Sequence, residues 1–202
     1  INLYGATKLC SDKIFVSENK IKGARSITFS VVRYGNVMGS RGSVIPFFLK
    51  EAKKGILPIT HKKMTRFNLT LEESVNMVLC SIDNSKGGEI FVPRIPSYRI
   101  TDLAEAIGPN CKKTIIGIRR GEKIHEEMIS INDAPTTYKS NDSFIILPQD
   151  NDFINNYLKQ DNSLESVQSN FSYNSGTNEN FLSIEKIRSL IKENIDLSFQ
   201  PY

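Results

Sequence analysis

The segment that most constrains the fold is 26–34, together with the stretches on either side of it. It reads Ser-Ile-Thr-Phe-Ser-Val-Val-Arg-Tyr, and this enrichment in β-branched and aromatic residues predicts a buried strand. A helical stretch covers about 1–20, and a loop with three glycines, 35–42, follows the strand. Helix, strand and glycine loop in this order predict an α/β fold with a ligand beside the loop. An ordinary turn is the alternative for the loop.

The rest of the chain alternates between the two kinds of element. We expect helices at 44–54, 71–82, 102–107, 124–128 and 183–195, and strands at 57–60, 64–69, 89–93, 114–118 and 143–148. Thr70 and Glu73 form a capping box at the start of the helix 71–82. One face of that helix is apolar and is predicted to be core: Val75, Val78, Leu79 and Ile82. The polar stretch from 149 to about 180 is predicted to be loop or partly disordered.

Charge and cysteine content exclude several classes of protein. The net charge of +4 is spread along the chain, and its densest basic cluster, 61–66, is short. A solvated face or an anionic small-molecule site explains that cluster better than nucleic acid does. No apolar run is long enough to span a membrane. Three scattered cysteines and two distant histidines predict reduced thiols, a cytoplasm-like compartment and no metal site, and His125 is assigned to a surface helix.

The first helical stretch carries a pair of residues with catalytic potential. Tyr4 and Lys8 are four positions apart, so they share one face of a helix. A lysine ammonium held near a phenol favours the phenolate, and a phenolate can take a proton from an alcohol while a hydride leaves the same carbon. The alternative is a surface helix with an exposed tyrosine and a long, solvated lysine, because about half a chance match to Tyr-x-x-x-Lys is expected in this chain.

The beginning of the chain predicts a fragment. The sequence has no initiator methionine, and it opens inside the expected helix with no capping residue evident ahead of Tyr4. We therefore expect a front portion to be missing.

Five motifs occur in the order found in one enzyme family. They are 4–8 (Tyr-Gly-Ala-Thr-Lys), 33–37 (Arg-Tyr-Gly-Asn-Val), 64–67 (Met-Thr-Arg-Phe), 87–93 (Gly-Gly-Glu-Ile-Phe-Val-Pro) and 117–123 (Gly-Ile-Arg-x-Gly-Glu-Lys). Together they resemble the inverting UDP-N-acetylglucosamine 4,6-dehydratases, which are extended short-chain dehydrogenase/reductases that make precursors of pseudaminic acid and other surface sugars. The resemblance spans about 1–148, and 173–178 also looks like the family.

The resemblance implies a fold and a division of the chain. The fold would be the C-terminal part of an NAD(P)-binding Rossmann-like domain together with a smaller substrate-binding portion. Residues 1–43 would end the dinucleotide-binding domain. Residues 44–148 would be mostly substrate-binding with returning Rossmann elements, and 149–202 would be a polar loop and a C-terminal helix.

The resemblance also implies roles for individual residues. Tyr4 and Lys8 would be the catalytic tyrosine and its lysine, and both would contact NADP. The remaining NADP contacts would be Val37, Met38, Gly39, Ser40 and Arg41. The UDP-sugar contacts would be Asn36, Val44, Lys62, Arg119 and Glu122. The complete enzyme would be a cytoplasmic homo-oligomer that binds neither nucleic acid nor membrane.

Several departures from the family limit the prediction. Arg120 stands where the family has proline, and Asn68 stands where it has an aromatic residue. The glycine-rich loop that cradles the cofactor pyrophosphate is missing, as is an Asp-Lys pair ahead of the tyrosine helix. We therefore expect these residues alone to be inactive.

Two other functions stay open at this stage. A related nucleotide-sugar epimerase or reductase would share Tyr4 and Lys8 and differ after the ketone forms. A non-catalytic protein that binds polyanions through Lys62, Lys63 and Arg66 is the alternative from another class.

Overall fold

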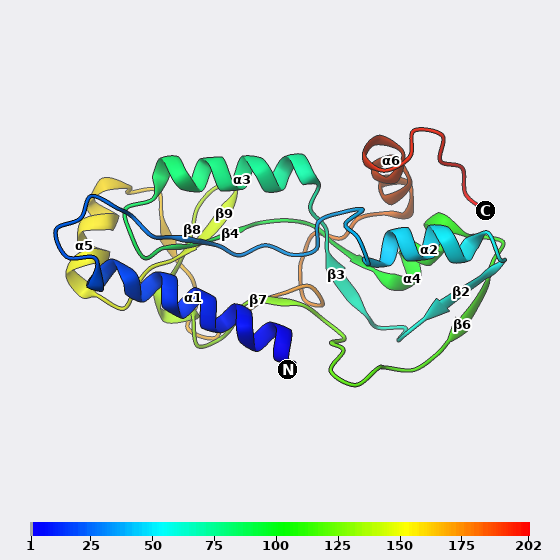
Figure 1. Cartoon of the computed structure of the whole chain (residues 1–202), viewed down its shortest axis with the longest axis horizontal. Helices are drawn as coiled ribbons and strands as arrows, with labels where there is room; N and C mark the ends of the chain where they lie inside the picture. The colour runs from blue at the N-terminus through cyan, green and yellow to red at the C-terminus, as the bar shows by residue number, and fades with distance from the viewer. Residues whose placement is uncertain (1) are drawn as a thin grey trace. The chain divides into compact units, whose positions relative to one another are not determined.

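The computed structural model describes residues 2–202, which form two compact units built from alternating stretches of the chain. Unit 1 contains the residues up to Tyr34, Val75–Arg94 and Glu127–Tyr173, and unit 2 contains Gly35–Ser74, Ile95–Glu126 and Asn174–Tyr202. Each unit combines helices with parallel and antiparallel strands, so the predicted α/β class is confirmed (Figure 1). The assignment of cofactor and substrate roles to ranges 1–43, 44–148 and 149–202 stays a prediction.

Unit 1 is built on a five-stranded sheet in the order β1-β4-β9-β8-β10. These strands are β1 (Val31–Val32), β4 (Ile90–Pro93), β9 (Ser143–Ile146), β8 (Thr137–Lys139) and β10 (Glu165–Ser166). The β1–β4 pair is parallel, and the other pairs are antiparallel. The buried strand predicted at 26–34 is therefore too long, because only Val31 and Arg33 donate backbone hydrogen bonds to the β4 segment, and Val31 and Val32 are half-buried.

The first helix, α1 (Leu3–Ile21), confirms the helix predicted over about 1–20. It does have a cap, contrary to expectation: the side chain of Asn2 accepts a hydrogen bond from the Gly5 amide. None of its residues is buried among the described residues. Its far end is tied to unit 1 by Asn19, whose side-chain amide both donates to and accepts from the backbone of Phe29.

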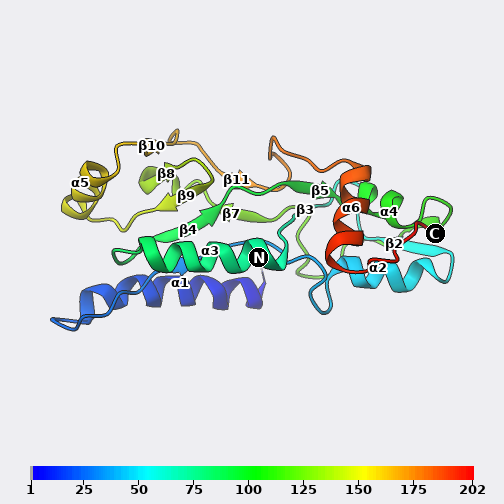
Figure 2. The same cartoon turned by 90° about the horizontal axis from the view of Figure 1, so that it is seen from above.

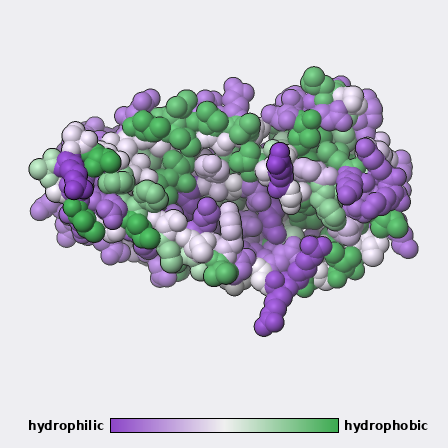
Figure 3. All heavy atoms as spheres, viewed as in Figure 1, coloured by the Kyte–Doolittle hydropathy of each residue, from purple (hydrophilic) through white to green (hydrophobic). Residues whose placement is uncertain are grey.

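The helix α3 (Leu71–Asn84) begins with the predicted capping box, in which Thr70 and Glu73 bond each other's amides. Its apolar face was assigned wrongly to the core, since Val75, Val78, Leu79 and Ile82 are all exposed and Ile82 is 67% exposed. Apolar surface is visible over this helix in Figure 3. The side that packs in unit 1 carries Met77 and the buried Ser81, whose hydroxyl donates to the Met77 carbonyl.

The polar stretch from 149 to about 180 is largely structured, so the prediction of loop or disorder was wrong. It contains the helix α5 (Asn151–Gln160), β10 and β11 (Tyr173–Asn174). Asp150 caps α5 by accepting from the Phe153 amide. Tyr157 is buried in a cluster with Phe91, Ile145 and Leu147, which anchors a helix that has few apolar residues.

Unit 2 holds three helices, which are α2 (Val44–Ala52), α4 (Ile100–Ile107) and α6 (Ile184–Asn194), and two pairs of strands. The parallel pair is β2 (Ile56–Ile59) with β6 (Lys112–Ile115), and the antiparallel pair is β3 (Thr65–Phe67) with β5 (Ser97–Arg99). Figure 2 shows α2, α4 and α6 gathered beside β2. Their facing sides form the core of the unit, in which Leu103, Ile107 and Ile191 are fully buried.

The helix predicted at 124–128 is absent, and His125 does not belong to a surface helix. Residues 127–129 instead form β7 (Glu127–Ile129), which pairs with β11. Pairing with a strand far along the chain overrides a local helical pattern. The remaining element is a short 3-10 helix, η1 (Ala134–Thr136).

Two general findings concern membranes and metals. Among residues 2–202, no helix combines the length and apolarity needed to cross a bilayer. In the same part of the chain, no three His, Cys, Asp or Glu side chains are grouped so that they could hold a metal ion.

The contrast between the buried Ile191 on α6 and the exposed Ile82 on α3 gives a prediction about stability. Ile191→Ala should lower the free energy of unfolding of this chain by about 2–5 kcal/mol, because Ile191 is fully buried and its truncation leaves a cavity. Ile82→Ala, the matched control on α3, should change it by less than about 0.5 kcal/mol. Urea unfolding followed by far-ultraviolet circular dichroism measures both values, and equal losses for the two variants would contradict the assignment of the core.

Candidate active site

Tyr4 and Lys8 lie together on the first turns of α1. The Lys8 Nζ atom is 5.5 Å from the centroid of the Tyr4 ring, so the amine and the ring share one side of the helix, as their spacing predicts. Both side chains are exposed, Tyr4 by 72%. The pair can therefore meet a ligand from solvent.

The helix that carries this pair is held to unit 1 by an arginine at the end of β1. Arg33 donates two hydrogen bonds to one oxygen of Asp12 on α1, at 3.1 and 2.8 Å. The same guanidinium donates to the Met128 carbonyl and to a carboxylate oxygen of Asp133. All three charged side chains are at most 20% exposed. Because Asp12 is one helical turn beyond Lys8, this cluster fixes the part of α1 next to the pair.

The loop after β1 contains the predicted nucleotide contacts of unit 2. Asn36, Ser40 and Arg41 are exposed, whereas Met38 is buried in the core of the unit, and its amide donates to the Leu69 carbonyl. The Met38 side chain is therefore part of the core and does not line a surface. Gly39 has a φ of +75°, and a Cβ there would lie 3.1 Å from Ile195, so glycine is required.

This loop fits an anionic ligand in two respects. Within residues 2–202, the amides of Arg41 and Gly42 donate no hydrogen bond, and the Arg41 side chain is exposed beside them. Free amides next to a guanidinium are suited to a phosphate. Val44, the first residue of α2, packs partly against the core.

Lys62 and Arg119 leave the same edge of unit 2. Lys62 follows the carboxyl end of β2 and Arg119 follows that of β6, and these two strands are parallel neighbours. Both side chains are exposed. The Glu122 carboxylate accepts from the Arg119 amide, and the Glu122 amide donates to the Arg119 carbonyl, so the two residues close one turn. The Arg119 guanidinium is exposed, and its contact with the UDP-sugar stays a prediction.

Arg66, by contrast, is committed to the protein itself. Its guanidinium donates to the carbonyls of Thr65, Ile124 and Lys123, at 2.7 to 3.1 Å, and its side chain is 12% exposed. The Glu126 carboxylate lies 3.5 Å from its Nε atom. A surface that binds polyanions through Lys62, Lys63 and Arg66 therefore lacks one of its three cations.

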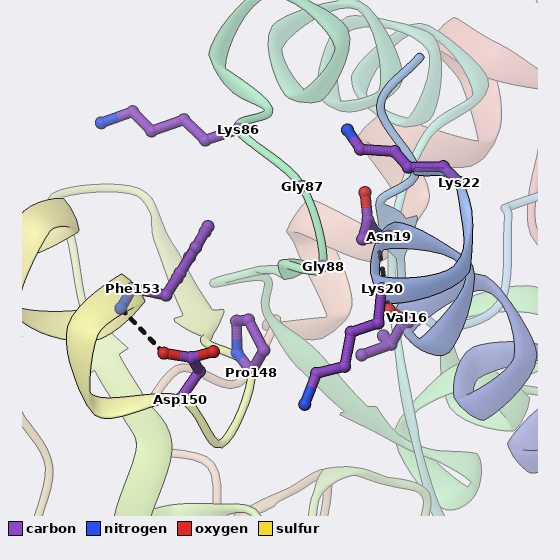
Figure 4. A pocket seen from close by; sticks show the side chains of 10 residues that line it. All are labelled: Val16, Asn19, Lys20, Lys22, Lys86, Gly87, Gly88, Pro148, Asp150 and Phe153. Atoms are coloured by element: carbon purple, nitrogen blue, oxygen red, sulfur yellow. Dashed lines mark hydrogen bonds between the residues drawn. The ribbon is translucent and has the colours of Figure 1, made fainter. Parts of the chain in front are cut away.

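A cavity of about 210 Å³ lies elsewhere in unit 1, between α1, the turn before β4 and the start of α5 (Figure 4). Lys20, Lys22 and Lys86 line it, but their amines point in different directions in Figure 4. Lys22 donates to the Ile27 carbonyl, and the Lys86 amine lies over the Tyr157 ring. None of the predicted site residues lines this cavity, and the three amines do not converge on one ligand.

Comparison with known proteins identifies the family of the chain. Residues 1–148 match the family model described as Polysaccharide biosynthesis protein. The chain belongs to this family. A UDP-N-acetylglucosamine 4,6-dehydratase (inverting) of Campylobacter jejuni subsp. jejuni serotype O:2 is 48% identical over 199 residues, which are 95% of this chain and 59% of the relative.

Two further proteins are similar to this chain. A UDP-glucose 4-epimerase of Rickettsia canadensis is 39% identical over 138 residues, covering 66% of this chain and 40% of the relative. The structure of Pen from Bacillus thuringiensis superposes with a TM-score of 0.81 at 32% identity, covering 96% of this chain and 57% of that one. The chain thus spans a little over half the length of the relatives it matches across nearly its whole sequence.

The residues that hold the Tyr4–Lys8 helix and the segment beside Arg119 were not predicted from the sequence. Arg33 was part of a motif, but its partner Asp12 is 21 positions away, and nothing in the sequence marks the two as a pair. His125 was also missed: its Nδ1 atom lies 2.8 Å from the Thr65 hydroxyl, 60 positions away. The available signal was that Arg33, Thr65 and Arg66 lie inside the motifs that carry the resemblance to the 4,6-dehydratases.

The Arg33 cluster gives a prediction about α1. Asp12→Ala should lower the local stability of α1 by about 1–3 kcal/mol, because it leaves a largely buried guanidinium without its main partner. Asp102→Ala breaks an exposed ion pair with Arg99 and should cost at most about 0.5 kcal/mol. Amide hydrogen exchange of α1 measures the first loss, and unchanged protection in Asp12→Ala would contradict the role of the cluster.

Proposed function

We propose that this chain is part of an inverting UDP-N-acetylglucosamine 4,6-dehydratase. The observation that carries the proposal is the position of the Lys8 amine beside the Tyr4 ring on α1, in a chain of this family. The 48% identity to the Campylobacter jejuni dehydratase supports this substrate and this reaction. The product would be a UDP-4-keto-6-deoxy-N-acetylhexosamine inverted at C5, for surface polysaccharide or flagellin glycans.

In this mechanism Tyr4, as phenolate, removes the proton of the C4 hydroxyl while hydride leaves C4. Lys8 would hold the nicotinamide ribose, with its amine beside the reacting phenol. The resulting C4 ketone acidifies the C5 proton, and loss of that proton together with the C6 hydroxyl eliminates water across C5–C6. Return of hydride to C6 and reprotonation of C5 from the opposite face give the inverted product. Proton transfers at C5 and C6 belong to the Asp-Lys pair that the family carries ahead of the tyrosine helix.

NADP is the proposed cofactor, and when bound it supplies reversible hydride storage. The residues available to hold it are Tyr4 and Lys8 on α1 and the loop Val37–Arg41, where a guanidinium and free amides suit a phosphate. Its pyrophosphate needs the glycine-rich loop that these residues lack, so we expect this chain alone neither to bind NADP⁺ measurably nor to turn over.

The UDP-sugar would be held by exposed side chains of unit 2. Asn36 and Lys62 offer an amide and an ammonium, and Arg119 offers a guanidinium that pairs bidentately with a diphosphate. Glu122 shapes the turn that presents Arg119. We also propose that the complete enzyme is a cytoplasmic homo-oligomer.

An epimerase or reductase acting on a nucleotide sugar is the second candidate. It is favoured by the 39% identity over 138 residues to a UDP-glucose 4-epimerase. It would use the same phenolate and the same C4 ketone, and it would differ by keeping the C6 hydroxyl.

The role of the phenol can be tested in the complete enzyme. Tyr4→Phe should lower kcat at least about a thousandfold, because no other group takes the C4 hydroxyl proton, while UDP-N-acetylglucosamine binding changes less than about twofold. Tyr138→Phe, on β8 of unit 1, is the control and should keep full turnover. Product formation followed by nuclear magnetic resonance and binding by calorimetry are the measurements. Undiminished turnover by Tyr4→Phe would refute the proposed role.

A further inference from the structure

A chain of buried hydroxyls in unit 2 ends on His125. The Glu126 amide donates to the Ser175 hydroxyl at 2.8 Å, the Ser175 and Thr65 hydroxyls are 2.8 Å apart, and the Thr65 hydroxyl is 2.8 Å from His125 Nδ1. Ser175 is fully buried and Thr65 is 4% exposed.

The direction of the hydrogen bonds follows from counting donors and acceptors. Ser175 Oγ already accepts from the Glu126 amide, so its proton needs an acceptor, and the only one in contact within the described chain is the Thr65 oxygen. The Thr65 proton must then go to His125 Nδ1. His125 is thereby held as the neutral tautomer with its proton on Nε2.

The reverse direction leaves a polar group unsatisfied. A proton on His125 Nδ1 would donate to Thr65, which would donate to Ser175, and the buried Ser175 proton would have no acceptor among residues 2–202. The charged groups that face the ring agree with the neutral form. Burial first, and then the positive charge of Arg66 and of His61, lower the pKa of His125. Glu126 does not offset them, because it is engaged by Arg66 and Lys123.

The ring is also fixed in place by a glycine. A Cβ at Gly176 would lie 2.5 Å from His125 Nδ1 and 2.7 Å from two ring carbons, so only glycine allows the ring to pack there. The network and this close approach together leave the imidazole one position and one tautomer.

The segment fixed in this way is the one that carries Arg119 and Glu122. At one end of it, the Ile116 amide donates to the Ile59 carbonyl. At the other end, the Ile124 carbonyl accepts from the Thr65 amide and from Arg66, and His125 is held by the Thr65 hydroxyl. Residues 117–123 therefore span two anchors on β2 and β3, and the β3 anchor is the one that includes a titratable group.

We infer that His125 is a positioning residue for the substrate. His125 is the neutral acceptor at the end of the hydrogen bonds that run from Ser175 through Thr65, which we call the Ser175–Thr65 relay. In this role it fixes the position of the loop through which Arg119 meets the nucleotide diphosphate. The inference rests on the proposed function for the identity of the ligand. Protonation of His125 reverses the relay and loosens the β3 anchor.

The test compares Thr65→Val, which removes the relay hydroxyl at constant shape, with Thr65→Ser, which keeps it. In the complete enzyme, Thr65→Val should raise KM for the UDP-sugar about tenfold with kcat within about twofold, and Thr65→Ser should stay within about twofold of wild type in both.

In wild type KM should rise as the pH falls below about 6.5, the ordinary pKa of histidine. His125→Asn places an acceptor near the Nδ1 position but does not titrate, so its KM should stay flat over that range.

A second measurement separates this inference from the proposed function. Side-chain ¹⁵N resonances of this chain report the tautomer directly, and His61→Gln assigns the two histidines. We expect an unprotonated Nδ1 and a protonated Nε2 for His125 at pH 7.5, unchanged in Thr65→Ser and averaged between tautomers in Thr65→Val. A proton on Nδ1, or equal KM values for Thr65→Val and Thr65→Ser, would overturn the inference while leaving the dehydratase reaction standing. If the enzyme makes another product, the tautomer of His125 and the affinity of the enzyme for UDP itself still test whether the relay positions the Arg119 loop.

Discussion

The Arg33 guanidinium is the interaction on which the rest of unit 1 depends. Helix α1 has no buried residue in the described chain, so apolar packing contributes little to its position. Arg33 stands at the end of β1 and bonds at once to Asp12 on the helix, to Asp133 and to the Met128 carbonyl. A planar fork with several N–H donors can hold three partners in fixed directions, which an ammonium cannot do. The placement of Tyr4 and Lys8 on unit 1 follows from that geometry.

Unit 2 uses a second arginine in the same way. Arg66 connects β3 to the carbonyls of Lys123 and Ile124, and the neighbouring Thr65 adds the hydroxyl relay to His125. Arg33 and Arg66 are thus both internal cross-links, although the sequence offered Arg66 as a contact for a polyanion. Under the proposed function the exposed cation Arg119 would meet the diphosphate, and its loop is held at one end by the Arg66 cross-link.

Local signals in the sequence were enough for part of this structure. The Tyr4–Lys8 spacing placed both side chains on one side of α1, and the Thr70–Glu73 box and Ser183 marked true helix starts. The apolar face of α3 was found, but periodicity does not say what covers a face, and Ile82 is exposed. Residues 124–128 were mistaken for a helix because the pairing of β7 with β11 is not local. The partners Thr65 and Ser175 are 110 positions apart, which no single-sequence pattern reveals.

The account rests on a phenol that opens the chemistry at C4 of a UDP-sugar and on an elimination that follows it. The most direct measurement is the nuclear magnetic resonance spectrum of the product that the complete enzyme forms from UDP-N-acetylglucosamine in deuterated water. The account predicts a 4-keto-6-deoxy sugar with inverted configuration and deuterium at C5. A product that keeps its C6 hydroxyl and carries no deuterium at C5 would contradict it and assign the chain to an epimerase.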